Sequence, residues 1–147
     1  MTKKLEDDTT VATEDTLQQL RDVRRGLIQL HKTLLDAERI RYERLFGRVE
    51  GGGVLLQLLI HDPWFGWLRP LSALIVQVDE RLDADEPVLA SEARAFIDQV
   101  RSILRPDEAG DVFAEHYFSA LQQTPDVVMA HRAVTRCIKP PSAGEGR

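Results

Sequence analysis

Cysteine and strand-like alternation are both nearly missing from this chain. One cysteine among 147 residues, Cys137, excludes an intramolecular disulfide and any CxxC metal or redox motif. A single cysteine with no partner for a disulfide is typical of a protein in a reducing compartment. No apolar leader follows Met1, so we expect a cytoplasmic protein. No segment alternates apolar and polar residues for the length of a strand, which argues against a sheet.

The motifs of common enzymes are missing as well. The sequence contains no GxSxG, no GxGxxG and no Walker-type loop. Its one glycine run, residues 51–53, lacks the lysine and hydroxyl residue that would hold a phosphate, and we interpret it as a hinge. We therefore predict no catalytic residue and no cofactor, and we favour a protein that is not an enzyme.

Membrane and nucleic-acid partners are disfavoured by composition. Residues 54–78 carry only Asp62 and Arg69 as formal charges, but prolines interrupt the stretch before it reaches the ~20 apolar residues of a spanning helix. It fits the centre of a bundle, and we expect no peripheral membrane contact. Basic residues dominate 21–48 and acidic residues dominate 79–115. The net charge of −5 argues against nucleic acid, and the two regions can pair within one fold or across a dimer.

The clearest helical pattern lies near the N-terminus. Apolar residues recur at spacings of three and four up to Phe46, and Gly47 is a reasonable stop: Leu17, Leu20, Val23, Leu27, Leu30, Leu34 and Ala37. Thr16 with Gln19 resembles a capping box. About thirty residues at 1.5 Å each give a helix of roughly 45 Å. Such a helix either spans the whole domain or extends into a partner.

Shorter helical patterns follow, separated by proline and glycine. Proline marks two starts, at Asp62-Pro63 and Thr124-Pro125, and the connections are short. We predict an all-α, up-and-down helical bundle of about five helices with a long first helix. The domain should cover residues 14–138, between disordered tails at 1–13 and 139–147.

The most unusual local segment is His61–Pro70, which holds both tryptophans. It admits three interpretations. It could form a ligand pocket with tryptophan walls, an exposed aromatic anchor for a protein partner, or a structural corner that plugs the bundle. The first two interpretations make the following residues candidates for ligand or partner binding: His61, Asp62, Trp64, Trp67 and Arg69.

Interior histidines raise a metal alternative. His31, His116 and His131 each lie on or beside the apolar face of a different helix, and Glu38 lies two turns after His31. These four residues are the candidate metal ligands. The Glu-x-x-His and His-x-x-x-His spacings of metal-binding bundles are absent, so ordinary hydrogen bonds to carboxylates or carbonyls are the competing interpretation.

Two stretches carry a resemblance to a known group of proteins. LHKTLLDAERIRYERLFG (residues 30–47) and LLQLLIHDPWFGWLRPLSALIVQVDE (residues 55–80) resemble a family of uncharacterised bacterial proteins. The resemblance covers roughly the first two thirds of the chain. The resemblance implies a small cytoplasmic bacterial helical protein, and it implies nothing about the activity of the protein. The layout is also loosely similar to DinB-like and haemerythrin-like bundles, whose histidine spacings this chain lacks.

Together these patterns predict a non-catalytic helical module that binds a protein partner or forms a homodimer. The alternative is a bundle that binds a metal ion or a small ligand through its interior histidines.

Overall fold

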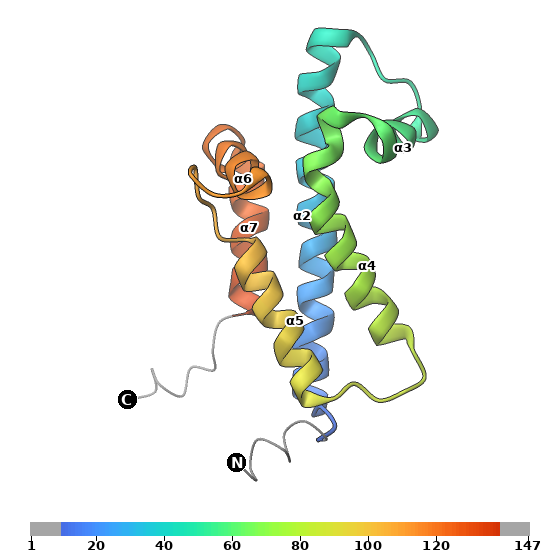
Figure 1. The fold of residues 1–147 in the computed structure, drawn as a ribbon, viewed down its shortest axis with the longest axis vertical. Coiled ribbons are helices and arrows are strands. Elements are labelled where there is room, and N and C mark those ends of the chain that lie inside the picture. The colour runs from blue at the N-terminus through green and yellow to red at the C-terminus, as the bar shows by residue number, and fades with distance from the viewer. Residues whose placement is uncertain (1–9, 139–147) are drawn as a thin grey trace.

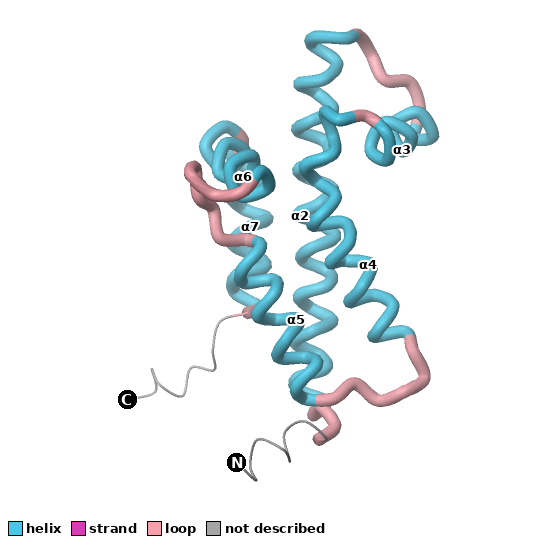
Figure 2. Tube along the Cα trace, viewed as in Figure 1, coloured by secondary structure: helices cyan, strands magenta, loops and turns pink. Residues whose placement is uncertain are grey.

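The computed structural model describes residues 10–138, and these residues form an all-α bundle, as predicted. Figure 2 shows the helices and the short connections between them. The described part holds six α-helices and one 3-10 helix, one α-helix more than expected: α2 (Glu14–Phe46), α3 (Gly52–His61), η1 (Pro63–Leu68), α4 (Arg69–Asp83), α5 (Ala90–Ile103), α6 (Val112–Gln123) and α7 (Pro125–Cys137). The extra helix is α3, which the sequence marked only as a short apolar segment.

The two expected tails lie mostly outside the described residues. Residues 10–12 differ from the expected disorder, because Ala12 donates its backbone N–H to Val88 at 2.8 Å and Ala90 donates to Thr10 at 2.7 Å. Ala12 is also buried. The segment just before α2 is therefore held against the connection between α4 and α5.

The long first helix is confirmed, with 33 residues in α2. Its start differs from the expected one: Thr13 is the N-cap, and its hydroxyl accepts the backbone N–H of Thr16 at 3.1 Å. Thr16 therefore lies inside the first turn and is not the cap. Gly47 ends the helix with a φ of 97°, a conformation that glycine adopts without strain.

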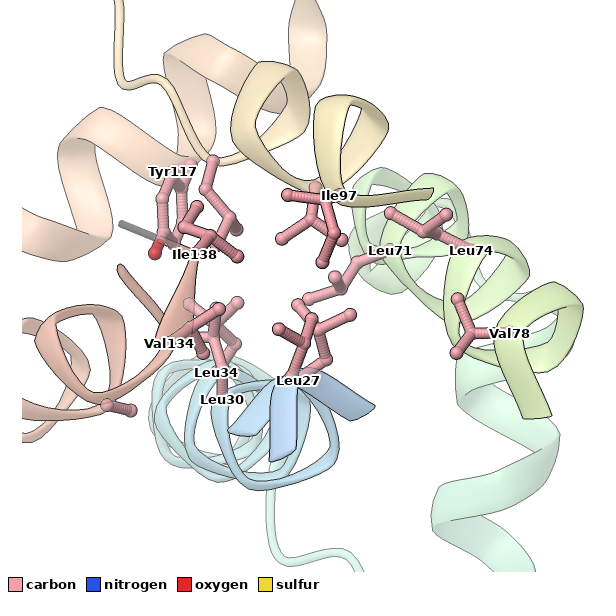
Figure 3. Close-up of a cluster of buried hydrophobic side chains, with 14 of the residues drawn as sticks. Leu27, Leu30, Leu34, Leu71, Leu74, Val78, Ile97, Tyr117, Val134 and Ile138 are labelled. Atoms are coloured by element: carbon pink, nitrogen blue, oxygen red, sulfur yellow. The ribbon is translucent and has the colours of Figure 1, made fainter. Parts of the chain in front are cut away.

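The other helices pack around the buried stripe of α2. Figure 1 shows α2 running the length of the molecule, with α4 on one side and α5, α6 and α7 on the other. Figure 3 shows how Leu27, Leu30 and Leu34 of α2 face side chains from the surrounding helices, among them Leu71 and Val134. This apolar core supplies the main stabilisation, since burial of apolar surface dominates folding.

Two helices approach closely where α2 meets α7. A Cβ atom added at Gly26 would lie 2.9 Å from Cγ2 of Val134, closer than real Cβ contacts allow. Gly26 therefore has a packing reason to lack a side chain in the middle of a helix, where glycine otherwise costs roughly 0.5–1 kcal/mol relative to alanine.

The opposed charges of the early and late regions meet within the fold. Arg24 of α2 donates to Asp79 of α4 at 3.0 Å and lies 3.8 Å from Asp83. A second pair lies within the later region, where Arg81 binds Glu92 at 2.7 Å and ties α4 to α5. Some of the opposite charges of the two regions thus pair within one copy of the chain.

The helix α3 stands apart from this body. Figure 1 shows it beside the upper end of α2, on the side away from α6 and α7. Its main contacts are with η1, and none of its residues is buried. Every other α-helix among residues 10–138 buries at least two side chains. An apolar helix in this position is the first sign of an interaction surface.

Candidate functional site

The segment His61–Pro70 forms a corner between α3 and α4. Asp62 caps η1, its carboxylate accepting the backbone N–H of Trp64 at 2.8 Å. Arg69 donates to the carbonyl of Ile60 at 2.6 Å and so caps the end of α3. Phe65, Trp67 and Leu68 are buried in the bundle. Asp62 and Arg69 thus hold the two helix ends of the corner.

The two tryptophans of the corner have different environments. Trp67 donates its indole N–H to Oε1 of Glu38 at 2.8 Å. The indole nitrogen of Trp64 is buried and has no hydrogen-bond partner among the described residues. The Trp64 ring instead packs edge-on against Tyr42 and Phe46, at 6.1 and 5.9 Å between centroids. The Trp67 side chain is thus fixed by a hydrogen bond, whereas the Trp64 side chain packs without one within residues 10–138.

Glu38 is the one charged residue that is buried among residues 10–138. Its other oxygen, Oε2, accepts from Nη1 of Arg41 at 3.3 Å, while the Arg41 side chain stays 46% exposed. The Arg41 guanidinium also lies 5.9 Å from the centre of the Trp64 ring, within range of a cation–π contact. The buried carboxylate therefore connects both tryptophans of the corner.

A cavity of about 200 Å³ opens beside this carboxylate. Three elements line it: α2 with Glu38 and Arg41, η1 with Trp67, and α6 with Glu115, His116, Ser119 and Ala120. The His116 ring stacks on Trp67, with 5.2 Å between centroids and 22° between planes. The structure thus brings two of the four candidate metal ligands, Glu38 and His116, to one pocket.

The other two candidate ligands lie in separate hydrogen bonds. His31 pairs through Nε2 with the Ser72 hydroxyl at 2.7 Å, and burial lowers the pKa of His31. His131 pairs through Nδ1 with the Tyr117 hydroxyl at 2.6 Å, and burial lowers the pKa of His131 as well. Burial raises the pKa of Tyr117 well above its usual value, so the phenol keeps its proton in this hydrogen bond with His131.

The candidate metal ligands therefore do not share one site. His31 contacts Ser72, His131 contacts Tyr117, and His116 stacks on Trp67. Within residues 10–138 no group of three or more His, Cys, Asp or Glu side chains is arranged to hold a metal ion. His61 is exposed at the end of α3 and lines a separate shallow pocket with Asp62 and Pro63.

A second feature of this end of the molecule is apolar. Five large side chains on the last turn of α2 and on α3 are between 48% and 66% exposed, and we call them the apolar tip: Leu45 (66%), Phe46 (64%), Val54 (50%), Leu56 (53%) and Ile60 (48%). No charged residue occurs between Gly51 and His61. The opposite face of α3, with Leu55, Leu58 and Leu59, is half buried.

Sequence reasoning missed the residues that complete the pocket. Arg41 stands one turn after Glu38, a spacing at which two helical side chains meet, so this pairing was detectable. Glu115 and Ser119 lie on α6 beside His116, but no local pattern relates α6 to η1. Only the tertiary packing of α6 against η1 brings them to Glu38.

No helix in the described part of the chain is both long enough and apolar enough to cross a bilayer. Comparison of the chain with known protein families, curated proteins and solved structures finds no match. The argument about function therefore rests on the apolar tip and on the pocket at Glu38.

Proposed function

We propose that this protein is a non-catalytic helical module that forms a homodimer through its apolar tip. The observation that carries the proposal is α3, an uncharged helix with half-exposed Val54, Leu56 and Ile60. Leu56, Gln57 and Ile60 follow helical spacing and lie on one exposed face. A face of this kind is costly to leave in water and is typical of a contact between proteins.

The extent of the apolar tip fits a protein partner. Five large side chains, each half to two-thirds exposed, present on the order of 500 Å² of apolar surface, near the upper end of what monomers leave open. A standard interface takes about 800 Å² from each partner. The tip and the polar residues around it therefore supply enough surface for one interface.

A second copy of the chain is the occupant that the charges favour. Arg44, Arg48 and Glu50 surround the tip, all exposed, so the rim carries both signs. In a twofold contact each patch faces its own copy, and a rim of mixed sign can pair with itself where a rim of one sign would repel. A membrane surface is disfavoured, because helices that lie on lipid carry lysine and arginine on their polar face and α3 has neither.

The same proposal places the protein in the cytoplasm of a bacterium. The cytoplasmic location is supported by the single cysteine, Cys137, and the bacterial source follows from the expected resemblance of residues 30–47 and 55–80 alone. Fractionation of cells that express the chain with an epitope tag measures this directly.

Sedimentation velocity over a wide range of protein concentration tests the dimer. The wild-type chain should shift from monomer to dimer as concentration rises. Replacing Leu56 and Ile60 with serine should raise the dissociation constant roughly tenfold or more, because the substitutions remove apolar contact area from the centre of the interface.

The matched control replaces Val76 and Met129 with serine, since both are large, apolar and at least half exposed but lie on α4 and α7. This control should dimerise like the wild type. A chain that stays monomeric at the highest concentration, or a control that weakens as much as the α3 variant, would rule the proposed interface out.

A further inference from the structure

The pocket beside Glu38 has the features of a binding site that is separate from the apolar tip. It lies between α2, η1 and α6, encloses about 200 Å³ and is lined mainly by polar side chains around the Trp67 ring. Helices of bundles commonly hold ligands in such clefts between them. The question is what chemistry its lining groups can recognise.

Glu38 provides the buried end of the pocket, and its bonding is incomplete. Each carboxylate oxygen accepts one hydrogen bond, from Trp67 at 2.8 Å and from Arg41 at 3.3 Å. A carboxylate has about four acceptor positions. The Arg41 bond is also longer than the about 2.7–2.9 Å of a strong charge-assisted bond. A buried charge with so little compensation is stabilised by any ligand that brings further N–H donors.

His116 adds a second acceptor. Its Nδ1 pairs with the carbonyl of Val112 at 2.9 Å, and because a carbonyl only accepts, Nδ1 carries the ring proton. In the neutral ring Nε2 is then an acceptor, and no hydrogen bond to Nε2 occurs among the described residues. Stacking on Trp67 fixes the plane of the ring at the pocket wall.

The remaining lining groups leave the pocket with one net negative charge. Glu38 and Glu115 each contribute one negative charge and Arg41 contributes one positive charge, with His116 counted as neutral. The Ser119 hydroxyl already accepts from Gln123 at 2.9 Å. Acceptors therefore outnumber donors, and a ligand with one positive charge and several N–H groups balances both the charge and the hydrogen bonds.

We propose that this pocket binds a guanidinium group. A guanidinium carries one positive charge and five N–H donors in a plane, which match the carboxylates of Glu38 and Glu115, and its planar group can stack on aromatic rings such as those of Trp67 and His116 that line the pocket. The Arg41 contact shows that a guanidinium already reaches Oε2 of Glu38. Because the Arg41 side chain is half exposed, a second guanidinium can compete with it for Oε2 of Glu38.

Tryptophan fluorescence measures the binding in a Trp64→Phe chain, where Trp67 is the one remaining tryptophan. Methylguanidinium chloride is the probe, methylurea is its neutral analogue, and potassium chloride corrects for ionic strength. The signal should saturate with methylguanidinium and stay unchanged with methylurea. A parallel titration with N-acetylarginine amide distinguishes a free small cation from an arginine side chain, since an arginine of a partner requires that this larger probe also binds.

Substitutions of the lining residues should change the affinity for methylguanidinium in opposite directions. Glu38→Gln and Glu115→Gln should each weaken binding roughly tenfold, because each removes a charged acceptor. Arg41→Gln should strengthen it, because it removes the competing guanidinium. Glu80→Gln, an exposed change of the same charge on α4, should leave the affinity unchanged.

Glu115 is exposed, so its variant keeps the test valid even where Glu38→Gln impairs folding. Equal responses to methylguanidinium and methylurea, or an affinity that Glu115→Gln does not weaken, would overturn the proposal.

Discussion

Trp67 donates its indole N–H to the carboxylate of Glu38 at 2.8 Å, and this bond joins η1 to the far half of α2. The two residues are 29 positions apart, and both are buried. The bond therefore fixes the corner between α3 and α4 against the long helix. Both residues also line the pocket between α2, η1 and α6.

Replacing each tryptophan with phenylalanine separates the two roles of the corner. Trp67→Phe removes the better of the two donors to Glu38 and should lower the free energy of unfolding by about 2 kcal/mol. Trp64→Phe removes an indole nitrogen that has no partner within residues 10–138, so it should change stability by less than about 0.5 kcal/mol. Urea unfolding followed by circular dichroism measures both. Equal losses in the two variants would contradict the assigned role of Glu38.

The close approach of α2 and α7 predicts an unusual cost for alanine. Gly26→Ala should destabilise the protein by about 1 kcal/mol despite the higher helix propensity of alanine, because the new methyl group meets Val134. In a Val134→Ala background the methyl group has room, and the same change should stabilise by roughly 0.5–1 kcal/mol. Thermal unfolding of the four chains gives the coupling directly. Additive effects would mean that the two residues do not touch.

Burial of two histidines predicts a loss of stability in acid. Because burial lowers the pKa values of His31 and His131, the unfolded chain binds more protons than the folded chain as the pH drops below the ordinary histidine value of 6.5. Stability should therefore be complete above this value and fall as the pH is lowered through the folded-state pKa values. Urea midpoints measured from neutral to mildly acidic pH follow the effect.

The histidine contribution is isolated by substitution. His131→Gln should reduce the slope of stability against pH, since it removes one of the two buried groups that must be protonated. His61→Gln, at an exposed position on α3, should leave that slope as in the wild type. An unchanged slope in His131→Gln would show that His131 does not contribute to the acid effect.

Local sequence signals were sufficient to predict most of the helices but insufficient to predict the pocket at Glu38. The stripe from Leu20 to Leu34 predicts α2 because a regular spacing along one helix reports which face is buried. Gly47 marks the end of α2 and Pro125 marks the start of α7, and both signals depend only on the local sequence. The meeting of Glu38 with Trp67 and His116 depends on how three elements pack, and no spacing along the chain records that.

The burial of the short apolar segment before His61 could not be predicted from its composition either. Its composition fits the centre of a bundle, since Leu and Ile are usually buried. In the structure α3 lies outside, because the connection at residues 47–51 turns it away and η1 offers it only one face. Composition could not distinguish a buried core helix from an apolar helix with an exposed face.

Intermolecular distance at α3 tests the proposed dimer most directly. A nitroxide is attached at Gln57→Cys, between Leu56 and Ile60 on the exposed face, in a Cys137→Ser chain whose single thiol is then the new one. The account predicts a strong spin–spin interaction between copies that disappears on dilution with unlabelled protein, and a much weaker one for a label at Glu80→Cys on α4. No interaction at Gln57, or an equal one at Glu80, would contradict dimerisation through the apolar tip.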